Sequence, residues 1–176
     1  TITTNAKTLD FPISFNCAGA IYQLQDAFTT GVTRSTTLTL GTLDLNNFTY
    51  STGIFSGSGA GTRAIAFGTG NITCTGTGTV WNSSTVTSLT ITGTPVVNVT
   101  SVGSTAINVY IGQPSEANSI SFNFTGGTYA LLFGYLTGTP AVRNLNFTWY
   151  AGTFTIDVDA NTVVYGKLTF SSGMTV

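Results

Sequence analysis

The chain repeats the triplet Asn47-Phe48-Thr49 four more times, as Asn71-Ile72-Thr73, Asn98-Val99-Thr100, Asn123-Phe124-Thr125 and Asn146-Phe147-Thr148. The first residues of successive triplets lie 24, 27, 25 and 23 positions apart. Because side chains alternate between the two faces of a β-strand, each triplet turns its apolar residue to one face and its Asn and Thr to the other. A unit repeated at this period is typical of a β-solenoid, in which each coil adds one strand to a growing sheet.

The segments around the triplets agree with that interpretation. Short runs alternate apolar and polar residues, and Gly-Thr pairs follow most of them. No segment combines helical spacing with a helix start and stop signal. We therefore predict an all-β chain that forms one domain over residues 1–176, a right-handed parallel β-helix (β-solenoid) with coils of about 23–27 residues.

The alternative fold is an antiparallel β-sandwich or jelly roll, which also has many short strands. The sequence contains neither Asn-Gly nor Asp-Gly, the dipeptides favoured in two-residue hairpins, despite its 13 Asn and 21 Gly residues. A sandwich gives no reason for triplets at nearly constant spacing. In a solenoid the triplets fall on the same strand of successive coils, where neighbours about 4.8 Å apart bring like side chains together. The solenoid is therefore favoured.

The composition restricts the classes of partner. Charged residues make up 6% of the chain, against roughly a quarter in ordinary globular proteins, and the net charge is −1. A phosphate backbone would find no basic surface, so we expect no nucleic-acid partner. The polar surface comes instead from 36 Thr and 15 Ser residues. Low net charge also weakens repulsion between copies, so we expect self-association as a homo-oligomer or an end-to-end assembly.

Neither a membrane span nor a structural zinc site is expected. The longest stretch without a strongly polar side chain, residues 129–136, is far shorter than the roughly 20 residues of a membrane-spanning helix. Cys17 and Cys74 alone cannot build a tetrahedral zinc site, and we expect both to be buried free thiols. Both ends of the chain carry ordinary strand patterns, so we expect either a segment of a longer repetitive chain or a protomer that stacks end to end.

Several segments are similar to those of a known group of proteins. They are Lys7-Thr8-Leu9-Asp10-Phe11-Pro12, Tyr22-Gln23-Leu24-Gln25-Asp26-Ala27, Leu43-Asp44-Leu45-Asn46, Ile65-Ala66-Phe67-Gly68-Thr69-Gly70 and Gly166-Lys167-Leu168-Thr169. Over nearly its whole length the chain resembles long repetitive proteins predicted in tailed-phage and marine metagenomic genomes. The resemblance implies a virion fibre or adhesin protein, located outside the cell or on the virion surface, and it supplies no catalytic or binding residue.

Catalysis has little support in the sequence. The chain contains no histidine, which removes the commonest general base and His-ligated metals. Only Asp157 and Asp159 are carboxylates close in sequence, and on a strand they would share a face, as polysaccharide cleavage or calcium binding requires. An exposed acidic turn is the simpler interpretation. We expect no enzyme, no cofactor and no metal site, and keep a polysaccharide-degrading β-helix as an alternative.

Two sets of residues are candidates for contact with other molecules. Aromatic rings beside polar side chains favour sugar binding, so we predict a glycan site at Trp149, Tyr150, Tyr129 and Arg143. The Asn and Thr residues of the five triplets predict two polar columns on an outer face. Such columns satisfy one another's hydrogen bonds, and they also suggest an ice-binding alternative, since a flat array of hydroxyl and methyl groups can order water.

The sequence as a whole predicts a non-catalytic structural or adhesive module. We expect a fibre component, on a phage virion or otherwise extracellular, that assembles into rods or filaments and contacts host surface glycans.

Overall fold

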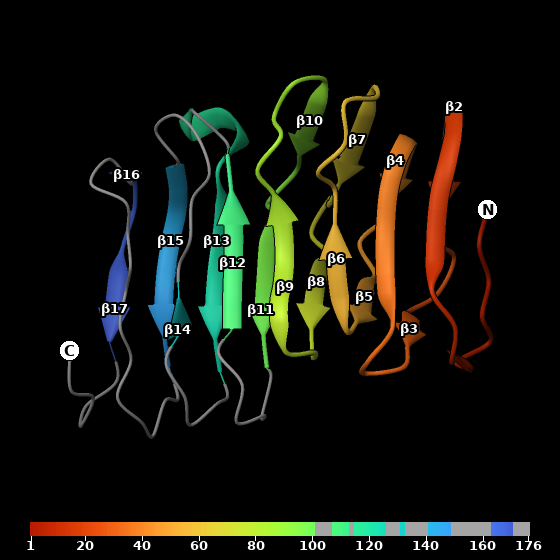
Figure 1. Cartoon of the computed structure of the whole chain (residues 1–176), viewed down its shortest axis with the longest axis horizontal. Coiled ribbons are helices and arrows are strands. Elements are labelled where there is room, and N and C mark those ends of the chain that lie inside the picture. The colour runs from red at the N-terminus through yellow and green to blue at the C-terminus, as the bar shows by residue number, and fades with distance from the viewer. Residues whose placement is uncertain (101–106, 113–114, 126–130, 133–140, 149–162, 171–176) are drawn as a thin grey trace.

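The computed structural model describes residues 1–100, 107–112, 115–125, 131–132, 141–148 and 163–170. Figure 1 shows the strands side by side in two layers along the long axis of the molecule, from β2 near the N-terminus to β17 near the C-terminus. The chain crosses from one layer to the other and back, and then adds its next strand beside the previous one. This winding is that of a solenoid.

One layer, which we call the ladder sheet, contains nine strands among the described residues. They are β1 (Thr8–Leu9), β3 (Phe28–Thr30), β5 (Thr49–Thr52), β8 (Asn71–Cys74), β11 (Val96–Val99), β13 (Ile120–Phe124), β15 (Ala141–Phe147), β16 (Val163–Val164) and β17 (Leu168–Phe170). The last two strands both pair with β15.

The other layer, the opposite sheet, contains eight strands among the described residues. They are β2 (Ile13–Gln23), β4 (Ser35–Asp44), β6 (Ile54–Ser56), β7 (Arg63–Ala66), β9 (Gly78–Ser83), β10 (Leu89–Thr92), β12 (Ile107–Ile111) and β14 (Leu131–Leu132). A single 3-10 turn, η1 (Glu116–Asn118), is the only helical element in the part of the chain that is described.

Every strand pairing in the described residues is parallel. Parallel neighbours cannot be joined by hairpins, so each connection has to pass around the molecule. The predicted parallel β-solenoid is thus confirmed, and the antiparallel sandwich is wrong.

The core follows directly from side-chain alternation. In β11 the side chains of Val97 and Val99 are fully buried while Asn98 faces outward, and the triplets of β8, β13 and β15 repeat this pattern. In the core, aromatic rings of successive coils stack on one another. The ring centroids of Phe124 and Phe147 are 5.0 Å apart, and those of Phe55 and Trp81 are 4.7 Å apart. Burial of these rings, together with the aliphatic core, stabilises the stack of coils along the axis.

Strand register gives the true length of each coil. Residues in one column of the ladder sheet pair with their neighbours in the order Thr8, Thr29, Ser51, Thr73, Asn98, Asn123, Asn146 and Thr169. The step in residue number from one member to the next is smaller over the first three coils than over the four that follow. The first coils are therefore shorter than the triplet spacing indicates.

This difference corrects the prediction that all five triplets share one strand position. Asn98, Asn123 and Asn146 are in register, but the register partner of Asn98 in β8 is Thr73 and not Asn71. A slip of two residues keeps a side chain on the same face, so Asn71 still points outward. A further slip of two places Asn47 outside β5, in the turn before it, with a positive φ of 67°.

The opposite sheet divides after β4, because β6 and β7 both pair with this one long strand. The strands β9 and β10 continue the two arms, pairing with β6 and β7 respectively. Residues 57–62 connect the first pair and residues 84–88 the second. In the third and fourth coils the solenoid therefore has an additional corner.

Arg63, at the start of β7, fills that corner and is only 1% exposed. Its Nη1 donates to the carbonyl oxygens of Gly61, at 2.8 Å, and Thr87, at 3.1 Å. Its Nε and Nη2 donate to the carbonyls of Gly57 and Thr85. Burial lowers the pKa of this guanidinium, which makes no ion pair with a described carboxylate. The charge is satisfied by backbone oxygens of both connecting segments.

The two cysteines differ in environment. Cys74 is fully buried, as expected, and burial raises the pKa of its thiol to about 12. Cys17 is exposed on β2, so the prediction that both thiols are buried is wrong for this residue. The reason is that β2 turns most of its residues between Asn16 and Ala20 toward solvent.

No helix in the described residues has the length and apolar character that crossing a membrane requires.

Replacing Arg63 should destabilise the fold strongly. Arg63→Met keeps an apolar stem but leaves four carbonyls without their donor, so the free energy of unfolding should fall by about 3 kcal/mol or more. Urea denaturation measures the change. Arg34→Met removes an exposed arginine from an ion pair with Asp10 and should change the midpoint little. Equal effects of the two substitutions would contradict this account of the corner.

The thiols should react in two steps. With a chromogenic disulfide reagent at pH 8, native protein should titrate one thiol, Cys17, because the buried Cys74 thiol stays protonated and shielded. In denaturant both thiols should react, and Cys17→Ser should abolish the native reaction alone. Two reactive thiols in the native state would show that Cys74 is not in the core.

Candidate functional site

The outer face of the ladder sheet carries a continuous chain of side-chain amides, the amide ladder (Asn71, Asn98, Asn123 and Asn146). Each Nδ2 from Asn98 onward donates to the Oδ1 of the asparagine one coil closer to the N-terminus. The donor–acceptor distances are 2.8 Å from Asn146 to Asn123, 2.9 Å from Asn123 to Asn98 and 3.1 Å from Asn98 to Asn71. Asn71 closes the chain by donating to Thr49 Oγ1 at 3.2 Å.

All amides of this ladder point the same way, so their dipoles reinforce one another. The regular spacing of parallel strands brings each amide within reach of the next, as in stacked asparagine ladders of other parallel sheets. The predicted polar column is therefore present from Asn71 to Asn146. Asn47 is not part of it, because its turn lies outside the strand, where its Oδ1 accepts from the Thr69 nitrogen at 2.9 Å.

A second column consists of threonines that follow by two positions the register column of Thr73, Asn98, Asn123 and Asn146. The backbone nitrogens of Thr75, Thr100, Thr125 and Thr148 each donate to a carbonyl of the preceding coil, at 2.9 to 3.1 Å. Thr125 and Thr148 are exposed. Of the predicted threonine column, Thr100, Thr125 and Thr148 lie in line. Thr73 instead pairs with Asn98, and Thr49 lies two positions before Ser51, the register partner of Thr73.

The predicted glycan site is described only in part. Trp149, Tyr150 and Tyr129 lie outside the described residues, as do Asp157 and Asp159 of the enzyme alternative. Arg143 is described, and it lies on β15. It is the one residue of the predicted glycan site that lies in the described part of the chain.

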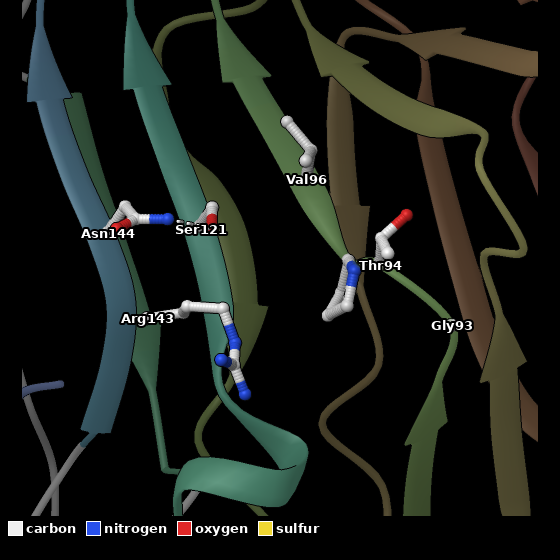
Figure 2. A pocket seen from close by; sticks show the side chains of 7 residues that line it. Gly93, Thr94, Val96, Ser121, Arg143 and Asn144 are labelled. Carbon is white, nitrogen blue, oxygen red and sulfur yellow. Dashed lines mark hydrogen bonds between the residues drawn. The ribbon is translucent and has the colours of Figure 1, made fainter. Parts of the chain in front are cut away.

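Arg143 borders a groove of about 300 Å³ at a corner of the ladder sheet. The described residues that line it come from the β10–β11 connection and from β11, β13 and β15: Gly93, Thr94, Pro95, Val96, Ser121, Arg143 and Asn144. In Figure 2 the Arg143 side chain reaches from β15 over β13 toward the 3-10 turn, while Asn144 points at Ser121. Sequence reasoning missed all of these residues except Arg143.

The backbone at this corner is fixed by glycine. Gly93 has a φ of +90°, and a Cβ added there would lie 2.5 Å from the nitrogen of Gly68 in the previous coil. Thr94 then binds the carbonyl of Gly68 through both its nitrogen, at 2.8 Å, and its hydroxyl, at 2.9 Å. A Gly-Thr pair after a strand was visible in the sequence as a turn, but the groove depends on which coils stack against it.

Arg143 is held by the 3-10 turn. Its Nη2 donates to the backbone oxygen of Glu116 at 3.0 Å, and its Nη1 lies 3.5 Å from the Glu116 carboxylate. The side chains are 43% and 59% exposed, so this ion pair is largely open to water. Two of the five guanidinium N–H donors suffice for these contacts, which leaves others available for a ligand.

Hydroxyl and amide groups complete the groove. Asn144 Nδ2 donates to Ser121 Oγ at 3.1 Å, and Asn144 Oδ1 accepts from the backbone nitrogen of Lys167 at 2.9 Å. Ser121 therefore accepts one hydrogen bond and keeps its own hydroxyl hydrogen for another partner. The groove thus combines one cation, one hydroxyl donor and the apolar surfaces of Pro95 and Val96.

The described carboxylates Asp10, Asp26 and Asp44 all have structural partners. Hydrogen bonding from Arg34 lowers the pKa of Asp10, and the backbone nitrogen of Thr4 lowers that of Asp26. A carboxyl with a lowered pKa is ionised at neutral pH and cannot serve as a general acid. In the described part of the chain, no three Cys, Asp or Glu side chains lie together as a metal ion would need.

The amide ladder should contribute measurably to stability. Asn123→Ala removes one donor and one acceptor from the middle of the chain of amides, so the free energy of unfolding should fall by about 1 to 3 kcal/mol. Urea denaturation gives the value, with the exposed Thr125→Ala as the matched control on the next column. If both variants unfold at the same denaturant concentration, the hydrogen bonds of the amide ladder do not stabilise the fold measurably.

Comparisons with known proteins found no match for this chain. No protein-family model, no curated protein and no solved structure matches it. What is established about the chain is therefore its fold, a parallel β-solenoid with repeated coils.

Proposed function

We propose that the chain is a non-catalytic structural and adhesive module, a shaft segment of a fibre that lies on a virion surface or otherwise outside the cell. The observation that carries the proposal is the unbroken parallel stacking of the ladder sheet from β1 to β17. A rod of this kind resists bending because backbone hydrogen bonds, buried rings and surface amides all run along its axis. The resemblance to repetitive phage proteins supports the virion location.

Exposed apolar side chains at both ends of the described stack support end-to-end assembly of copies. Ile21, on β2, is 65% exposed, and Leu168, on β17, is 50% exposed. Within the described residues β2 pairs along its length only with β4, and β17 pairs only with β15. Edge strands of this kind accept a further strand, and contacts between unlike ends generate filaments. With a net charge of −1, repulsion between copies is weak.

Ice binding is the second candidate, and the threonine column favours it. The rows Thr73-Cys74-Thr75, Asn98-Val99-Thr100 and Asn123-Phe124-Thr125 repeat a polar-apolar-Thr pattern on successive strands. The amides of the ladder column, however, already bond to one another, so only one column is free to order water. Ice-crystal shaping by the monomer would favour this candidate over the fibre.

Assembly should be visible and sensitive to an edge substitution. Negative-stain electron microscopy at increasing concentration should show rods or filaments longer than one 176-residue solenoid. Ile21→Lys places a charge on the β2 edge and should shorten or abolish them. Thr37→Lys adds the same charge on the exposed face of β4, away from the edge, and should leave them intact. Compact monomers at every concentration would contradict the proposal.

A further inference from the structure

The groove beside Arg143 has a composition that matches one class of ligand. We propose that it binds the carboxylate of an acidic saccharide, with the guanidinium of Arg143 on the carboxylate and the Ser121 hydroxyl on a ring hydroxyl. This inference rests on the adhesive part of the proposed function and names the glycan class that the module would contact.

The charge distribution selects an acidic ligand. Of the five cations in the chain, Arg34 is paired with Asp10 at 2.8 Å and Arg63 is buried against backbone carbonyls. Among the described residues, the carboxylate that pairs with Arg143 is that of Glu116, at 3.5 Å. Because this ion pair is long and open to water, the guanidinium keeps N–H donors for a ligand. A carboxylate bound there gains charge-assisted hydrogen bonds from the planar guanidinium.

The shape and lining select a sugar over a simple anion. A volume of about 300 Å³ is at the small end of ligand sites, suited to one pyranose ring and its substituents. Pro95 and Val96 offer apolar surface to ring C–H groups, and Ser121 offers a hydroxyl donor. A nucleic acid is a poor match, because its phosphates would meet few cations on a chain whose net charge is −1.

Arg143 is already in place for this role. The carbonyl of Glu116 accepts from Ser119 Oγ at 2.7 Å and from Arg143 Nη2 at 3.0 Å, so the guanidinium is anchored to backbone and does not depend on the Glu116 side chain. The Glu116 carboxylate instead competes with the ligand for the same cation. Removing that carboxylate should therefore strengthen binding, an effect opposite to the loss of Arg143.

Binding of galacturonate and trigalacturonate to the purified chain, followed by calorimetry or NMR titration, tests the proposal. The acidic sugars should bind with millimolar or tighter affinity, and galactose should bind at least tenfold more weakly. Arg143→Gln should weaken the binding of the acidic sugars roughly tenfold, whereas Glu116→Gln should strengthen it a few-fold. Arg34→Gln, the matched exposed ion-paired arginine, should have no effect.

Three results would overturn the inference: no binding of the acidic sugars, equal binding of galactose, or equal competition by inorganic phosphate, which would mean a general anion site. Circular dichroism of each variant shows whether it is folded, and Glu116→Gln tests the site even if Arg143→Gln is not. Electron microscopy separates the two proposals. Filaments without acidic-sugar binding would refute the glycan class alone, and acidic-sugar binding by permanent monomers would refute the fibre alone.

Discussion

Parallel stacking of like side chains at the strand spacing is the constraint on which the rest of this structure depends. A coil buries its apolar residues only against the coils on either side, so each coil has to present the same pattern as its neighbours. Inside, this produces the stacked rings of Phe124 and Phe147. Outside, it produces the amide ladder, where one asparagine satisfies the next. The same rule that builds the core therefore also builds the surface.

A surface of this kind stays polar with very few charges. Amides and hydroxyls replace the ion pairs of ordinary globular proteins, and the charged side chains that remain have specific positions. Arg63 fills the corner where the opposite sheet divides, and Arg143 lies at a groove beside the 3-10 turn, which interrupts the strand repeat. Both sites occur where the regular repeat is interrupted. In a repetitive fold, departures from the repeat are where specific recognition can develop.

The sequence predicted the fold class because two independent periods, alternation within a strand and recurrence of the triplets, agreed. It did not predict register, since a slip of two residues preserves the face: Asn71 and Thr73 both point outward, and the triplet pattern cannot distinguish them. It proposed Arg143 as a binding residue but gave no sign of Ser121, because Ser121 comes within hydrogen-bonding distance of Asn144, the residue after Arg143, only when successive coils stack in the observed register. Cys17 was misjudged because β2 leaves most of its middle residues in solvent.

Nuclear Overhauser contacts between asparagine side-chain amides test the central claim most directly. If coils stack in parallel in the register described, the amide protons of Asn123 should show contacts to those of Asn98 and Asn146, which lie on the coils to either side. Strong contacts between Hα protons of facing strands are a feature of antiparallel pairs and should be absent from the ladder sheet. Their presence, together with missing amide contacts, would contradict the solenoid and every inference built on it.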